Sequence, residues 1–219
     1  SPDLTRFRAF RRVQKNYTYL RLSGNIETLP NEALVAVTEG TTVADVEGVV
    51  FDPAHMTEWQ NYVRTALTKV DSLQLYQCPA WFLEHAVAPD DLSDKLKVRT
   101  FALSYDCVRC ETSSTHMVDV AENLEQLVQG IAPPARCATC RSSLLVTPTP
   151  EQIAVMRRLP ARDRDAVLDK FVTTARGEPN DKLDNCLVAL PQRAAAAKKV
   201  ANPRALYLDD PSAVLTYAG

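Results

Sequence analysis

The chain has 219 residues, of which 46% are hydrophobic and 24% are charged, and its formal net charge is −2. These proportions are those of an ordinary globular protein, and they exclude collagen-like, fibrous and disordered classes. The near balance of charges argues against a strongly basic nucleic-acid scaffold or a polybasic membrane binder. No apolar run approaches the roughly 18–20 residues that span a bilayer, and no signal-peptide pattern is present. We therefore expect a cytoplasmic protein without a membrane span.

The first 16 residues are basic, with two aromatic side chains, Phe7 and Phe10, among five cations: Arg6, Arg8, Arg11, Arg12 and Lys15. One interpretation is a strip that binds nucleic acid or an acidic partner, and the other is a solvated first strand or arm. The stretch is short, which favours the strand or arm.

Strands and helices are predicted to alternate in the first hundred residues. The clearest helix runs from 57 to 70, with Thr57 as its N-cap and apolar residues at i, i+3, i+4 and i+7. Trp59 has the spacing of a core residue in this helix. The other predicted elements are strands at 17–24, 48–53 (buried and central), 73–78 and 98–104, a helical pattern at 31–46 that Gly40 breaks, and a helix at 79–87. This order predicts an α/β fold with a largely parallel or mixed sheet flanked by helices.

The last third of the chain has a helical pattern. Thr149 is followed by Pro150, and Gln152 lies three residues after Thr149, which is the signature of a capping box. A second helix is predicted at 162–176, and an extended tail begins near residue 206. We predict three parts: an α/β domain at 1–104, a metal-binding segment with an inserted helix at 105–147, and a helical extension with its tail at 148–219.

Four of the six cysteines form two CxxC pairs separated by 26 residues, namely Cys107, Cys110, Cys137 and Cys140. This is the spacing of a zinc ribbon. Zn²⁺ takes four tetrahedral ligands, and each tight turn directs two thiolates toward one point. Four thiolates leave no open coordination position, so we predict one structural zinc ion per chain.

Other interpretations of the same spacing are two redox dithiols or two disulfides. A redox pair usually opens a helix after a strand, whereas the second pair here reads as a turn between short strands. Disulfides suit a secreted chain, of which there is no sign. His116, between the pairs, is an alternative ligand, and Arg109 and Arg136 would offset part of the negative charge of four thiolates. The remaining cysteines, Cys78 and Cys186, are expected to be buried free thiols.

Residues 17–147 resemble a known combination of domains. Residues 20–27, LRLSGNIE, resemble the strand and turn that open STAS domains, the fold of anti-sigma-factor antagonists. Residues 49–52, VVFD, are similar to the central strand of that family, and an amphipathic helix follows at the same place. Residues 104–110, SYDCVRC, resemble the exit from the domain in STAS-like proteins of myxobacteria and related bacteria that carry a zinc ribbon.

The resemblance implies a STAS-like domain at 1–104 followed by a zinc ribbon, inside a bacterial cell. Regulated STAS domains carry a phosphorylatable Ser and a Gly before this helix; residues 54–59 contain neither, so a kinase-controlled switch is not expected. Glu58 either imitates a phosphoserine or complements the helix dipole. The docking face of the family, transferred by position, includes His55, Thr57, Glu58 and Gln60.

We therefore predict a non-enzymatic protein-protein interaction or scaffold module of a bacterial regulatory or multiprotein assembly, whose partner is another protein. The alternative is a nucleic-acid-binding zinc-ribbon protein. Acidic residues in and beside the interval between the knuckles make a poor surface for phosphates: Glu111, Asp119, Glu122 and Glu125. No nucleotide-binding loop, nucleophile elbow, HExxH or catalytic-triad motif occurs, so we expect no enzymatic activity.

Overall fold

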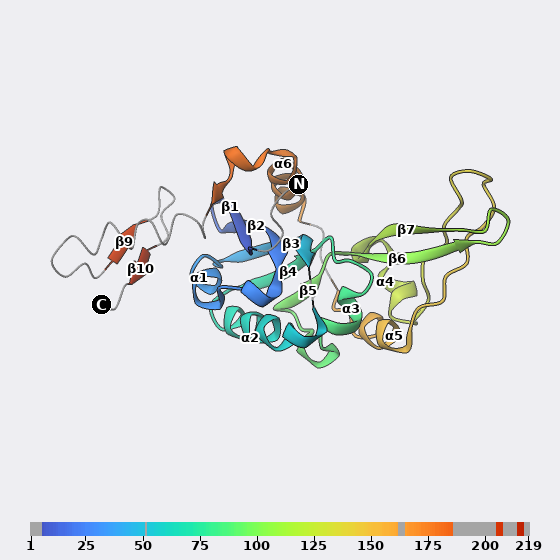
Figure 1. The fold of residues 1–219 in the computed structure, drawn as a ribbon, viewed down its shortest axis with the longest axis horizontal. Coiled ribbons are helices and arrows are strands. Elements are labelled where there is room, and N and C mark those ends of the chain that lie inside the picture. Colours follow the sequence, from blue (N-terminus) through green and yellow to red (C-terminus); the bar gives the residue numbers. More distant parts are fainter. Residues whose placement is uncertain (1–5, 51, 162–164, 186–204, 208–213, 217–219) are drawn as a thin grey trace.

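A mixed β-sheet forms the centre of the protein (Figure 1). The structure, a computed structural model, describes residues 6–50, 52–161, 165–185, 205–207 and 214–216. The sheet has six strands in the order β5-β4-β3-β2-β1-β8. These strands are β1 (Arg8–Gln14), β2 (Tyr17–Asn25), β3 (Thr41–Val50), β4 (Ser72–Tyr76), β5 (Leu96–Val98) and β8 (Asp184–Asn185). Strands β2 to β5 run parallel, whereas β1 is antiparallel to both of its neighbours. The predicted α/β class with a mixed sheet is confirmed.

Helices lie on both faces of this sheet. Helices α1 (Asn31–Ala36) and α2 (Met56–Leu67) lie on one face, and α6 (Ala166–Gly177) lies on the other (Figure 1). Side chains alternate between the faces along each strand. Leu20 and Ala44 accordingly belong to the main hydrophobic cluster with α1 and α2, while their neighbours Tyr19 and Val43 pack with α6 in a smaller cluster.

The remaining elements include an antiparallel hairpin that extends away from the sheet (Figure 1). They are β6 (Thr100–Cys107), β7 (Thr112–Asp119), α3 (Phe82–His85), α4 (Val120–Leu127), α5 (Pro150–Met156) and the pair β9 (Ala205–Tyr207) and β10 (Val214–Thr216). Strand β6 crosses the predicted boundary at residue 104, and the main hydrophobic cluster continues from the sheet into β6, β7 and α5. The three-part division stays a prediction.

The third strand is longer than predicted. The helix predicted at 31–46 ends at Ala36, and β3 begins at Thr41 after a turn at Gly40, whose φ is +58°. A Cβ at Gly40 would lie 2.4 Å from the Asn16 carbonyl oxygen, so the turn excludes other residues. The buried central strand predicted at 48–53 was wrong in extent, since residues 48–50 are only the end of β3. Val50 is 46% exposed there.

The start of α2 also differs from the prediction. The helix begins at Met56, so Thr57 lies in its first turn and is not its N-cap. The Asp52 carboxylate accepts from Ala54 N at 2.9 Å and caps the short 3-10 turn that precedes the helix. Trp59 is fully buried, as predicted, with its ring centroid 5.5 Å from that of Phe82.

The capping box of α5, formed by Thr149 and Gln152, is confirmed. The strand predicted at 98–104 is two strands, β5 and β6, because the chain changes partner at Arg99; β6 does end at Cys107. Strand β7 was not predicted, because its Ser- and Thr-rich sequence has no hydrophobic alternation. Residues 162–164, Cys186 and the Ala/Lys-rich stretch from 192 lie outside the described residues.

The basic start of the chain is a strand of the sheet. In β1, Arg11 is buried and Arg12 pairs with Glu178 after α6. Phe7 and Phe10 are also buried. A strand at residues 8–14 is therefore confirmed, but the expectation that it is solvated was wrong for residues 9–11, which are buried between neighbouring strands. Of the five cations, Arg11 is buried and Arg12 is paired.

None of the helices in the described part of the chain combines the length and apolar character that crossing a bilayer requires.

The attachment of α6 leads to a stability prediction. Phe171 is 4% exposed and belongs to the small cluster, whereas Val167, on the same helix, is 59% exposed. We expect Phe171→Ala to lower the free energy of unfolding by about 3 kcal/mol, because it removes buried apolar area and leaves a cavity. Val167→Ala should change it by no more than about 0.5 kcal/mol. Urea unfolding of both variants is the measurement, and equal effects would contradict the packing described.

Candidate functional site

The four predicted ligand cysteines meet at the tip of the β6–β7 hairpin. Their Sγ atoms all lie within 4.8 Å of one another. The Cys107 and Cys140 sulfurs are 3.5 Å apart, and those of Cys110 and Cys137 are 3.9 Å apart. A tetrahedron with metal–sulfur bonds of 2.3 Å has edges of about 3.8 Å. All four are free thiols rather than disulfides, and the cluster can therefore hold a metal ion.

The two CxxC turns, or knuckles, close with the same backbone conformation. The residue after the second cysteine of each pair is in the left-handed region, with φ of +53° at Glu111 and +60° at Arg141. This conformation is uncommon for residues other than glycine. In the first knuckle Cys110 N also donates to Cys107 Sγ at 3.4 Å. The repeated left-handed residue closes each turn so that both of its sulfurs lie on one side.

Hydrogen bonds prepare two of the sulfurs to carry negative charge. The hydroxyl and backbone N–H of Ser142 donate to Cys140 and lower its pKa to about 6. Backbone N–H groups of Cys140 and Thr139 lower the pKa of Cys137. Cys110 instead donates its proton to Cys140, which raises the pKa of Cys110 to about 12. Because a bound metal needs thiolates, coordination would displace that shared proton.

The cluster is attached to the hydrophobic core. Cys107 is 2% exposed and Cys137 is 7% exposed, and both belong to the main hydrophobic cluster. The backbones of Asp106 and Leu145 exchange two hydrogen bonds, of 2.7 and 2.9 Å, which join β6 to the segment returning from the second knuckle. The Tyr105 hydroxyl also donates to the Pro133 carbonyl at 2.8 Å. A metal here would connect segments that are far apart in sequence.

The other residues considered for this centre lie around it. His116 is outside the cluster, with its ring 5.1 Å from that of Tyr105 and a 3.0 Å contact with the Ser114 hydroxyl. Arg109 and Arg136 are exposed beside the ligands. The predicted turn at the second pair is confirmed, and an isolated bridge between Arg136 and Ser143 takes the place of the predicted short strands.

The predicted docking residues lie together in the first turns of α2 and just before it. Thr57 is exposed, while His55, Glu58 and Gln60 are half-buried. His55 Nδ1 lies 3.9 Å from Glu58 Oε1. Since Trp59, between them, is buried, the face is supported by the core. The exposed Val50 at the end of β3 adds an apolar side chain to the same end of the sheet.

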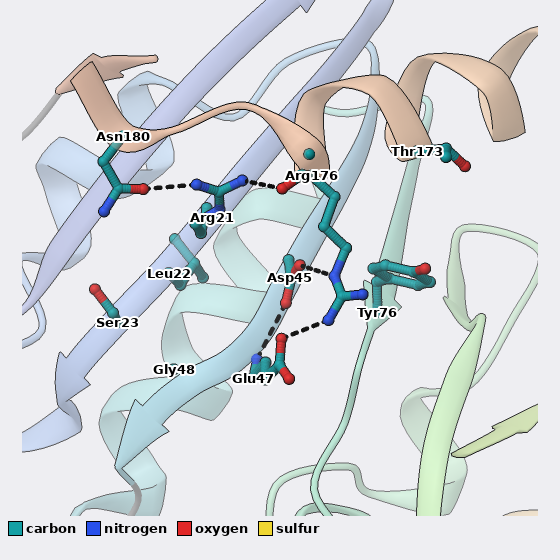
Figure 2. A pocket seen from close by; sticks show the side chains of 11 residues that line it. Arg21, Leu22, Ser23, Asp45, Glu47, Gly48, Tyr76, Thr173, Arg176 and Asn180 are labelled. Carbon is teal, nitrogen blue, oxygen red and sulfur yellow. Dashed lines mark hydrogen bonds and ion pairs between the residues drawn. The ribbon is translucent and has the colours of Figure 1, made fainter. Parts of the chain in front are cut away.

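A cleft of about 650 Å³, with both charged and apolar groups in its lining, opens where α6 ends above β2 and β3 (Figure 2). No motif in the sequence pointed to it. Its lining residues are Arg21, Leu22, Ser23, Asp45, Glu47, Gly48, Tyr76, Thr173, Arg176, Gly177 and Asn180. They come from β2, β3, β4, the second half of α6 and the short 3-10 helix Asn180–Lys182 that follows it. Open α/β sheets commonly bind ligands at the carboxyl ends of their strands.

Asp45 is the buried centre of this cleft. It is 3% exposed, and burial raises its pKa. The Tyr19 hydroxyl donates to its Oδ2 at 2.8 Å, and Arg176 Nε lies 3.4 Å from the same oxygen. An irregularity in β3 places one extra residue opposite β2 and allows Glu47 to face Arg176 as well, at 2.6 Å (Figure 2).

Arg21 closes the other side of the cleft by holding the end of α6. Its guanidinium donates to the carbonyls of Ala175, Arg176 and Glu178 at 3.0, 2.6 and 3.0 Å. The last carbonyls of a helix have no partner within the helix, so these bonds satisfy groups that would otherwise need water. In the sequence, the only sign of this cleft was the presence of charged residues within apolar strands. Arg21 and the end of α6 that it contacts are more than 150 positions apart.

Comparisons with models of known protein families, with curated proteins and with solved structures find no match to this chain.

The buried Tyr19–Asp45 pair leads to a second prediction. Tyr19→Phe should lower the free energy of unfolding by about 1–3 kcal/mol, because Asp45 loses a donor inside the protein. Tyr17→Phe is the matched control, since the Tyr17 hydroxyl donates at 2.8 Å to the more accessible Asp165.

The pH dependence of this loss follows from the raised pKa of Asp45. A raised pKa means that the ionised carboxylate of Asp45 is less stable in the folded protein than in the unfolded chain. Its cost to the free energy of unfolding therefore disappears as the pH falls through that pKa and the carboxyl becomes protonated. The Tyr19 hydroxyl stabilises the ionised form. The loss in Tyr19→Phe should therefore be larger at neutral pH than in acid. Urea unfolding at both pH values tests this, and a loss that grows in acid would contradict it.

Proposed function

We propose that this chain is a non-enzymatic protein-interaction module whose fold is braced by one structural zinc ion. The observation that carries the proposal is the group of four cysteine sulfurs within 4.8 Å, attached to the same hydrophobic cluster as the sheet. Such a centre stiffens the hairpin and the segment that returns along it, and it holds both against the α/β unit.

Zinc fits the donor set better than other common ions. Thiolates are soft ligands, which Mg²⁺ and Ca²⁺ avoid, and Zn²⁺ favours tetrahedral sites of four sulfurs. Four thiolates complete the coordination shell, so no position is left for water or substrate. This supports a structural role for the ion rather than a catalytic one.

The proposed docking face is the start of α2, with His55, Thr57, Glu58 and Gln60. The resemblance to STAS domains, which bind proteins at this position, is one support for it. The exposure of Thr57 and Val50 beside the buried Trp59 is the other, because side chains on a rigid element lose little freedom on binding. In this proposal the partner is another protein of a bacterial cytoplasmic assembly.

Metal analysis tests the brace. We expect one zinc per chain in the purified protein, and Cys107→Ser should lose it and unfold the hairpin region, because metal binding here is folding energy. Cys78→Ala is the control, since Cys78 is buried but does not belong to the four-cysteine group. The measurements are elemental mass spectrometry and thermal unfolding. A Cys107→Ser protein with full zinc content and native stability would refute the proposal.

Affinity capture from a lysate of the source organism, quantified by mass spectrometry, tests the docking face. Proteins held by the wild type should be lost with Thr57→Arg, because a large cation then occupies the face, and be kept with Thr65→Arg. Thr65 is also exposed on α2 but near its other end. Capture that is equal in both variants would exclude this face, and salt-dependent binding of a generic DNA duplex would favour the nucleic-acid alternative.

A further inference from the structure

The cleft in Figure 2 has the position and size of a small-molecule site. Its volume of about 650 Å³ lies within the range of about 300–1,000 Å³ that such sites occupy. It opens at the carboxyl ends of the parallel strands, on the face of the sheet that α6 covers. The docking face proposed at the start of α2 lies elsewhere on the molecule, so a ligand in this cleft is independent of the proposed function.

Two irregularities of the backbone bring side chains to this cleft. The extra residue in β3 allows both Asp45 and Glu47 to face Arg176. At the end of β4, Gln77 is buried with a φ of +57°, and its Oε1 accepts from Arg176 at 3.3 Å. Bulges and left-handed residues other than glycine are both concentrated at functional sites. Here they converge on one cleft.

The formal charges that line the cleft cancel. Asp45 and Glu47 both pair with Arg176. The guanidinium of Arg21 is occupied by the last carbonyls of α6. Nearby charges are also of both signs: the pairs Arg12–Glu178 and Arg99–Asp169, and Arg8, Asp181 and Lys182. A ligand with a net charge would therefore meet no marked excess of the opposite sign, which favours an uncharged ligand.

Several polar groups of the lining have no hydrogen-bond partner among the described residues. Asn180 accepts from Arg21 through Oδ1 at 2.6 Å, and because arginine only donates, the NH2 group of Asn180 is left over. The Ser23 hydroxyl, Glu47 Oε1 and Arg176 Nη1 are left over as well. In Figure 2 Ser23 and Asn180 lie on one side of the cleft, and the other pair lies opposite. Each side therefore offers both a donor and an acceptor.

We propose that this cleft binds an uncharged, hydroxyl-rich small molecule, a sugar or a polyol. A hydroxyl group both donates and accepts, so a compound with several of them satisfies both sides of the cleft at once. Its CH groups can pack against the ring of Tyr76, which also lines the cleft. A charged ligand gains only by separating the ion pairs of Arg176, and that leaves the buried carboxylate of Asp45 without its cation.

Such a ligand would connect α6 to the sheet. Arg176 and Asn180 lie at the end of the helix and just after it, whereas Ser23 and Glu47 belong to strands. Only the closed arrangement presents both sides, so binding opposes local opening of the helix end. The proposal therefore has a structural readout as well as an affinity.

Binding to the zinc-loaded full chain, measured by saturation-transfer NMR and calorimetry, tests the choice of ligand class. The neutral probes are common hexoses, pentoses, disaccharides and glycerol, and the charged probes are inorganic phosphate, acetate and putrescine. We expect a neutral probe to bind and the charged probes not to displace it. Binding of charged probes alone, or no binding of any neutral probe at millimolar concentration, would overturn the proposal.

Two variants test the place of binding. Ser23→Ala and Asn180→Asp should each weaken it about threefold to tenfold, the effect of one hydrogen bond. Asn180→Asp keeps the oxygen that faces Arg21 and loses only the NH2 group. Thr174→Ala is the control, because this exposed hydroxyl of α6 does not line the cleft, and it should leave the affinity unchanged.

Hydrogen exchange tests the connection between α6 and the sheet. Amides at the end of α6 should exchange about tenfold more slowly at a probe concentration ten times the Kd, whereas those of α2 should not change. Unaltered thermal unfolding shows that the variants are folded. Equal affinity in the wild type and both cleft variants, or binding that leaves exchange in α6 unchanged, would place the ligand elsewhere and refute the proposal.

Discussion

The fold depends on one constraint: the central strands β2 and β3 have apolar side chains on both faces, and both faces must be covered. Alternation sends Leu20, Leu22 and Ala44 to one side and Tyr19 and Val43 to the other. The first side is covered by α1 and α2, which are the crossovers between parallel strands. The second side has no crossover helix, so the chain covers it with α6, which comes from far along the sequence.

Helix α6 comes from late in the sequence, and its attachment to the sheet is largely polar. Its apolar contact is small, with Leu168, Phe171, Val172 and Ala175. Around that contact are ion pairs and hydrogen bonds: Arg99 with Asp169, Arg176 with Asp45 and Glu47, and Arg21 with the last carbonyls. Buried charges are stable only when they are paired. The cleft in Figure 2 is therefore also the place where the sheet holds the end of this helix.

The hairpin solves a different problem. In its outer half β7 is exposed on both faces, whereas β6 buries Leu103, Tyr105 and Cys107. Apolar burial there is therefore limited, and the four cysteines add a second cluster at the tip. The hydrogen-bonded return of the chain at Leu145 covers part of one edge, on β6. The edge of β7 has no such cover among the described residues.

Local patterns were sufficient for much of the fold. The amphipathic spacing around Trp59 identified α2, the Thr149–Gln152 box identified the start of α5, and the CxxC spacing identified four residues that meet in space. Patterns misled where local and tertiary preferences differ. Residues 41–46 have a helical spacing of apolar positions, but Gly40 turns the chain and β-branched residues join the sheet. The sequence of β7 shows no alternation of apolar residues. It is a strand because its backbone pairs with β6, and not because its own side chains are buried.

The sequence by itself determined the α/β class and the four cysteines that meet at one point, because both rest on short-range spacing: the period of a helix or strand, and the reach of one tight turn. Only the tertiary structure decided that Asp45 meets Arg176, that α6 covers the second face, and that β7 has a free edge. These contacts join residues up to about 150 positions apart, and no local pattern encodes which distant segments will be neighbours.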